Sequence, residues 1–140
     1  LSFLKSIKDI NAGEAYASDY SKKATKVMAS GEWHITFETG RAALRPEAKD
    51  IAEQIYNLLI QAENSKVEIV GHTDNTGTRD GNYSLSQARA EAVKSYLMQK
   101  GIPGTRFQKI EGRGQDEPVG DNSTAAGRAK NRRVIVTLLN

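Results

Sequence analysis

Several kinds of site and segment are missing from this 140-residue chain. It has no cysteine, which excludes disulfides and thiolate metal sites. No apolar run approaches the ~20 residues that span a bilayer. The net charge of +3 is mild, and no like-charge block or aromatic-basic surface indicates nucleic-acid binding. The chain starts at Leu1 rather than Met, so we interpret it as a fragment from which any targeting or anchoring segment is missing.

The composition, 38% apolar and 26% charged residues, is typical of one globular domain with a flanking segment. Residues 1–31 differ from the rest and predict a linker or docking arm that is partly helical. Tyr20, Ala24, Val27 and Met28 have the spacing of a short amphipathic helix that ends at Gly31. Residues 32–140 predict the main domain.

Hydrophobic periodicity in the main domain predicts four strands and two long helices. The order, βαβαβ(α)β, favours an α/β fold (an α+β sandwich) in which helices cover a small mixed four-stranded sheet. The predicted strands are 33–37, 66–73, 106–111 and 133–139. The first predicted helix begins at Pro46 and ends near Asn64. The second begins at a cap at Ser84 or Asn82 and ends before Gly101. A loop over 112–127 follows the third strand, and a short helical turn over 124–130 precedes the last strand.

One motif places an acid and a base close together. Residues 71–77 read GHTDNTG, with Asp74 at the mouth of a strand, and Arg89 follows on the next helix. An apolar stripe is predicted on that helix at Leu85, Ala88, Ala92, Val93, Tyr96 and Leu97, and Arg89 lies on the same face. A guanidinium at such a position needs an anionic partner or a cleft. Two interpretations remain open: an internal salt bridge from Asp74 to Arg89, or a clamp that grips a zwitterionic ligand.

The same residues resemble a known signature. The run GHTD from Gly71, with Asn82 and the run LSQARA from Leu85, is similar to the OmpA-like C-terminal domain. The resemblance covers about residues 32–140. Further matching segments are Phe37, the run LRP from Leu44, the run GRG from Gly112 with Pro118, and residues 122–134. The run ETG from Glu38 departs from the family, in which many members have an aspartate there.

The resemblance implies a non-catalytic domain that binds the diaminopimelate of the peptidoglycan stem peptide. It implies no cofactor, a membrane-anchored or lipidated parent chain as partner, and a place in the periplasm or cell envelope of a Gram-negative-type bacterium. Asp74 would then contact the ligand ammonium and Arg89 the carboxylate. Asn82 would donate a hydrogen bond to the peptide, and Leu85 with Phe37 would form an apolar wall. Thr73 would line the same pocket, and Arg132 would complete the anion site.

Other functions have weaker support in the sequence. A protein-interaction module, in which Asp74 and Arg89 only bridge each other and residues 1–31 dock a partner, is the main alternative. A wall hydrolase would need a paired-acid or metal constellation, and neither is evident. His34 and His72 without cysteine are too few for a zinc site, and the loop from Asp74 lacks the glycine and glutamate of a calcium-binding EF-hand.

Overall fold

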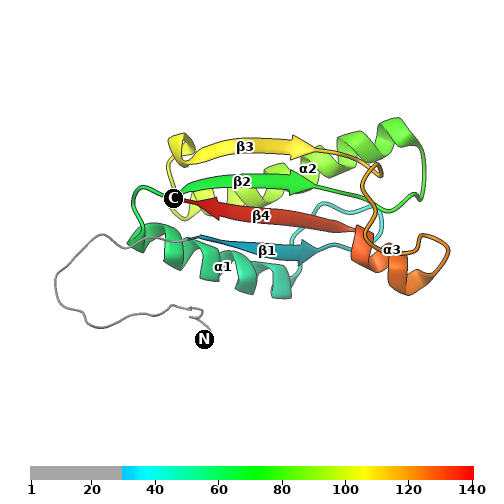
Figure 1. Cartoon of the computed structure of the whole chain (residues 1–140), viewed down its shortest axis with the longest axis horizontal. Coiled ribbons are helices and arrows are strands. Elements are labelled where there is room, and N and C mark those ends of the chain that lie inside the picture. The colour runs from blue at the N-terminus through cyan, green and yellow to red at the C-terminus, as the bar shows by residue number, and fades with distance from the viewer. Residues whose placement is uncertain (1–29) are drawn as a thin grey trace.

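The four strands form one mixed sheet in the order β1-β4-β2-β3. This computed structural model describes residues 30–140 (Figure 1). None of the helices in that range is long and apolar enough to cross a membrane. The elements are β1 (Gly31–Thr36), α1 (Pro46–Gln61), β2 (Lys66–Gly71), α2 (Arg79–Gln99), the 3₁₀ turn η1 (Gly104–Arg106), β3 (Phe107–Gly112), α3 (Ala125–Asn131) and β4 (Arg133–Leu139).

The last strand of the chain lies in the interior of the sheet. β4 pairs antiparallel with both β1 and β2, and β2 pairs parallel with β3 through the α2 crossover. β1 and β2 therefore run in the same direction with β4 between them. The predicted mixed four-stranded sheet with covering helices is confirmed.

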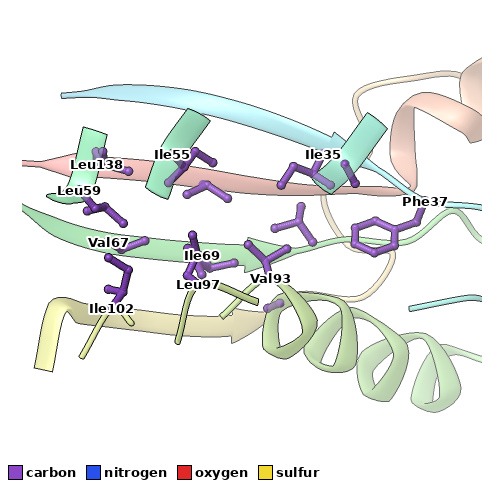
Figure 2. Close-up of a cluster of buried hydrophobic side chains, with 14 of the residues drawn as sticks. Ile35, Phe37, Ile55, Leu59, Val67, Ile69, Val93, Leu97, Ile102 and Leu138 are labelled. Atoms are coloured by element: carbon purple, nitrogen blue, oxygen red, sulfur yellow. The ribbon is translucent and has the colours of Figure 1, made fainter. Parts of the chain in front are cut away.

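The hydrophobic core lies between one face of the sheet and helices α1 and α2. Alternate residues of the strands, such as Ile69 and Val136, are fully buried against Ile55 of α1 and Val93 of α2. Burying a side chain of this size stabilises the fold by about 1.5–3 kcal/mol. Figure 2 shows Phe37 at one end of this cluster, and that end of the core adjoins the functional residues described below.

Helix α2 begins earlier than the sequence predicted. Thr78, rather than Ser84 or Asn82, is the N-cap: its backbone is extended and its hydroxyl accepts a hydrogen bond from the Gly81 amide at 3.0 Å. The predicted apolar stripe is also partly wrong, because Ala88 is exposed. The buried face of α2 instead carries Asn82, Ser86, Arg89, Ala90, Val93 and Leu97.

The predicted segment 1–31 overlaps the sheet by one residue. Gly31, where the sequence predicted a helix to end, is the first residue of β1. The rest of that predicted helix and arm lies outside the described residues.

Glycines bring α2 into close contact with the sheet. A Cβ at Gly71 of β2 would clash with the main-chain carbonyl of Ser86, and one at Gly112 of β3 would clash with Ser86 and Gln87. Hydrogen bonds strengthen the same contact, because the Gly112 amide donates to Oε1 of Gln87 at 2.8 Å and the Gly114 amide donates to Oγ of Ser86 at 2.9 Å. Arg89 lies one helical turn beyond Ser86, so this contact sets its position over the end of β2.

Candidate functional site

The seven predicted site residues come together at one end of the sheet. β1 and β2 both end there, and β4 and α2 both begin there (Figure 1). The seven side chains therefore come from four separate parts of the chain. Phe37 follows β1, Thr73 and Asp74 follow β2, Asn82, Leu85 and Arg89 lie on α2, and Arg132 connects α3 to β4.

Arg89 is completely buried at the centre of this end. Its Nη1 donates to the carbonyl oxygen of His72 at 3.0 Å, its Nη2 to that of Glu38 at 3.0 Å, and its Nε to that of Arg41 at 2.8 Å. The guanidinium also lies 5.2 Å from the ring centroid of Phe37, a cation–π contact. Arg89 thus ties the loop after β1 to the end of β2.

The charge of Arg89 persists at neutral pH. Burial is the main cause that lowers its pKa from 12.5 to about 10. The negative charge of Asp74 opposes this shift, whereas the positive charge of Arg132 adds to it. A fully buried cation that bonds directly to no anion among residues 30–140 therefore occupies this site.

Asp74 is buried and anionic. Its Oδ1 accepts a hydrogen bond from the Thr76 amide at 2.9 Å, and its Oδ2 lies 3.2 Å from Nη1 of Arg132. Burial acts to raise the pKa of Asp74, but the hydrogen bonds from Thr76 and Arg132 outweigh it and hold the pKa below its usual value of 3.8.

The internal salt bridge from Asp74 to Arg89, one of the two interpretations of the sequence, is wrong. None of the ion pairs within residues 30–140 joins Asp74 to Arg89; Asp74 pairs with Arg132 instead. The physical reason is that main-chain carbonyls already surround the Arg89 guanidinium. Arg132 pairs with the acid through its Nη1 and also donates from its Nε to the Phe37 carbonyl at 2.9 Å.

Polar side chains complete the wall next to Asp74. Nδ2 of Asn82 donates to the Asp74 carbonyl at 3.3 Å and to Oε1 of Gln115 at 2.8 Å. The Thr73 hydroxyl donates to the same Asp74 carbonyl at 2.7 Å, and the Thr73 amide donates to the Gly114 carbonyl at 2.9 Å. These contacts hold the main chain around Asp74 rigidly in place.

The two apolar residues of the site differ in exposure. Phe37 is 1% exposed and lies beneath Arg89, whereas Leu85 is half-buried on the first turns of α2. Arg132 also keeps some exposed surface, with 17% of its side chain accessible. Because Arg89 is 0% and Asp74 only 4% exposed, a ligand that contacts both must displace neighbouring atoms. Leu85 and Arg132 are the more exposed residues among the seven.

The sequence did not reveal every participant. Main-chain groups of Glu38, Arg41, His72 and Thr76 provide hydrogen bonds to the two charged residues. Main-chain groups carry no signature in residue type, so only the fold could identify them. Gln115 was also missed, because it is 33 residues from Asn82 and belongs to a loop without periodicity.

His72 has no direct side-chain role in this site. It is 2% exposed, and burial, followed by the charge of Arg133, lowers its pKa from 6.5 to about 4. Its imidazole is therefore neutral at pH 7. No group of three or more His, Asp or Glu side chains suited to a metal ion occurs in the described part of the chain.

Comparison with known proteins shows the family to which the chain belongs. Residues 36–132 match the OmpA family. The chain belongs to the OmpA family. The match includes all seven site residues, from Phe37 to Arg132, and the whole of β2 and β3, whereas β4 and all but the last residue of β1 lie outside it.

Among curated relatives, this OmpA family chain is 37% identical over 105 residues to the probable lipoprotein YiaD of Escherichia coli. That alignment covers 75% of this chain and 48% of YiaD, so the chain spans about half the length of that relative. Other relatives carry the names of outer-membrane lipoproteins, porins and a peptidoglycan-binding protein.

Solved structures of the family share the fold. The peptidoglycan-associated lipoprotein from Burkholderia pseudomallei matches with a TM-score of 0.72 and 25% identity, over 76% of this chain and 89% of that one. The cell wall anchor of the T6SS from Pseudomonas aeruginosa matches with a TM-score of 0.66 and 32% identity, over 81% and 87%.

Proposed function

We propose that this domain binds peptidoglycan non-covalently through the diaminopimelate of the stem peptide and so anchors a parent envelope protein to the cell wall. The observation that carries the proposal is the charge cluster at the end of the sheet. Two guanidinium groups, Arg89 and Arg132, flank one carboxylate, Asp74, which leaves one positive charge in excess. Such a cluster suits a ligand that carries both a carboxylate and an ammonium.

Both charged ends of the site have hydrogen-bonding capacity left for a ligand. A guanidinium has five N–H donors, and the carbonyls of the described residues accept from three of those of Arg89. A carboxylate has about four acceptor positions, and within the described residues Asp74 accepts from the amide and side chain of Thr76 and from Arg132. The end of the diaminopimelate side chain carries an ammonium for Asp74 and a carboxylate for Arg89 and Arg132.

The other predicted residues supply the walls of this site. Leu85 and Phe37 contact the apolar part of the ligand side chain, and Asn82 together with Thr73 faces the peptide. Because one residue of the polymer is gripped, the affinity of a single site is modest, and many tethered copies raise the effective affinity for the wall.

The relatives support the same assignment. Two solved relatives are described as a peptidoglycan-associated lipoprotein and as a cell wall anchor, which are binding rather than catalytic roles. Curated relatives named as outer-membrane proteins favour a place in the envelope of a Gram-negative-type bacterium. We infer that the domain makes and breaks no bond and needs no cofactor.

A calorimetric titration with two matched peptides tests this proposal. The first is a tripeptide that ends in meso-diaminopimelate, and the second replaces that residue with lysine, which keeps the ammonium and lacks the side-chain carboxylate. We expect the first to bind at least about 30-fold more tightly, because an unpaired buried charge costs about 2 kcal/mol or more. Equal affinities would contradict the contact with Arg89.

Variants of the protein complete the test. Asp74→Asn preserves size and removes the charge, so we expect it to weaken binding of both peptides. Asp50→Asn is the matched control, because Asp50 is an exposed residue of α1, and it should bind like the wild type. If Asp74→Asn binds both peptides as tightly as the control does, the assignment of Asp74 is wrong.

A further inference from the structure

An exposed aromatic ring lies beside the proposed peptide site. Four large apolar residues of the described chain are exposed, and Tyr83, at 43%, is the aromatic one. Tyr83 directly follows Asn82, whose amide contacts the main chain of Asp74. Because consecutive Cα atoms are about 3.8 Å apart, the backbone of Tyr83 directly adjoins that of a residue of the site wall.

The ring is held in place rather than free. Its hydroxyl donates to Oδ2 of Asp116 at 2.6 Å, and Oδ1 of Asp116 lies 2.6 Å from Nη2 of Arg79. The ring also packs near the backbone of Gly114, because a Cβ built there would lie 3.4 Å from two ring atoms. Gly114 has a φ of +56°, a conformation that favours glycine, so the absence of a side chain there leaves room for the ring.

The loop beneath the ring belongs to the peptide site as well. Asn82 binds Gln115, and Tyr83 binds Asp116, so two consecutive residues of α2 hold two consecutive residues of the loop after β3. The Gly114 carbonyl accepts from the Thr73 amide, next to Asp74. The same loop therefore contacts both the aromatic ring and the residues of the proposed peptide site.

We propose that Tyr83 is a sugar platform that contacts the glycan strand of peptidoglycan next to the gripped stem peptide, an inference that rests on the proposed function. The C–H groups on one face of a pyranose ring carry partial positive charge, which is attracted to the negative face of an aromatic ring. The stem peptide is joined directly to a sugar, so gripping the peptide brings that sugar close to this ring.

The surroundings of the ring favour a sugar over an apolar protein partner. The groups in contact with Tyr83 are the carboxylate of Asp116 and the backbone of Gly114, and the guanidinium of Arg79 adjoins them. Sugar hydroxyls can exchange hydrogen bonds with such charged neighbours. A protein hot spot, by contrast, is an aromatic residue in a well-packed pocket that excludes water.

The test compares a tripeptide that ends in diaminopimelate with the same tripeptide attached to its disaccharide. We expect the wild type to bind the disaccharide form about 5-fold more tightly, the scale of one aromatic contact. Tyr83→Ala should lose this preference and keep its affinity for the bare tripeptide. Tyr83→Phe should retain most of the preference, because it keeps the ring and loses only the contact with Asp116.

The control is Met98→Ala, which removes another exposed apolar side chain from the far end of the same helix and should keep the preference for the disaccharide. If the wild type binds the two ligands with equal affinity, or if Tyr83→Ala loses the same affinity for both, Tyr83 is not a sugar platform. The proposed peptide site is unaffected by either result. Failure of the wild type to bind the bare tripeptide would instead overturn the proposed function, and the sugar platform with it.

Discussion

Asp74 and Arg132 form an ion pair of 3.2 Å although 58 residues separate them in the chain. The pair exists because β4 lies between β1 and β2, which brings the residue before β4 to the end of β2. Arg89 does not pair with the acid and instead donates hydrogen bonds to three main-chain carbonyls. The site therefore contains one guanidinium that pairs with the acid and another that organises the backbone.

The stability that Asp74 contributes depends on pH. Its pKa in the folded protein is below 3.8, so its contribution is fully present above that value and is lost as the pH falls through the folded pKa. We expect Asp74→Asn to be less stable than the wild type at pH 7, and the difference to shrink below about pH 4. Urea denaturation of both proteins between pH 7 and pH 3 measures this. A difference that stays constant over the series would contradict the ion pair.

Arg89 has a large structural role beside its proposed binding role. Arg89→Ala removes the donors to three main-chain carbonyls, one of them in the buried His72, and leaves a cavity, so we expect a loss of about 3–5 kcal/mol in the free energy of unfolding. Arg89→Lys keeps the charge but cannot reach three acceptors at once, and should lose less. Chemical denaturation measures both losses.

Arg113→Ala is the control for these variants, because Arg113 makes exposed ion pairs with Glu111 and Glu117 and should change stability little. If Arg89→Ala is as stable as this control, the three hydrogen bonds of Arg89 do not stabilise the fold. The large loss expected also means that Arg89→Lys, rather than Arg89→Ala, is the variant to use in binding experiments.

His72 is expected to make the domain sensitive to mild acid. Its pKa falls from 6.5 in the unfolded chain to about 4 in the fold, so between these values the unfolded state binds more protons. Stability should be independent of this group above pH 6.5, fall as the pH drops towards 4, and change by about 3 kcal/mol in total. Denaturation midpoints measured across this range should show less dependence on pH in His72→Gln. An unchanged slope in His72→Gln would mean that the buried imidazole is not the source of the acid sensitivity.

The close contact of α2 with β2 should not tolerate a methyl group. Gly71→Ala places a Cβ against the carbonyl of Ser86, a main-chain atom that cannot rotate away, so we expect a loss of about 1–3 kcal/mol or more. Because Arg89 lies on the same helix, binding of the diaminopimelate peptide should weaken too. Gly104→Ala, whose Cβ would lie 3.6 Å from the flexible end of Met98, should change both quantities little.

Thermal melting measures the stability of the two glycine variants, and peptide titration measures their binding. Equal melting temperatures would show that α2 can shift without cost.

Much of the architecture was predictable from the sequence, because strong periodicity marks each buried element. β4 was predicted at its observed bounds, and α1 was predicted to begin at Pro46, as it does. The motif predicted that Asp74 and Arg89 lie close together, the resemblance added Phe37 and Arg132, and all of them lie at one end of the sheet, whereas their role in binding stays a prediction. Each of these features is encoded in the residues themselves or in their spacing.

The pairing within the site could not be predicted. Whether Asp74 meets Arg89 or Arg132 depends on the position of β4 in the sheet, which periodicity does not determine. The partners of Arg89 are main-chain carbonyls, and any residue type could have supplied them. The acid and the base were thus identified, whereas their relation to each other required the fold.

The N-terminus of α2 was predicted wrongly from local sequence signals, and this can be tested. The first turns of this helix are polar and contain Gly81, so apolar periodicity begins only at Leu85 and placed the cap near Ser84. The structure assigns the cap to Thr78. Thr78→Ala should therefore cost about 1 kcal/mol, the usual loss for a missing N-cap, whereas Ser84→Ala in the exposed helix should change the unfolding free energy by less than about 0.5 kcal/mol. Urea denaturation of the two variants would contradict the assignment if Ser84→Ala were the more damaging change.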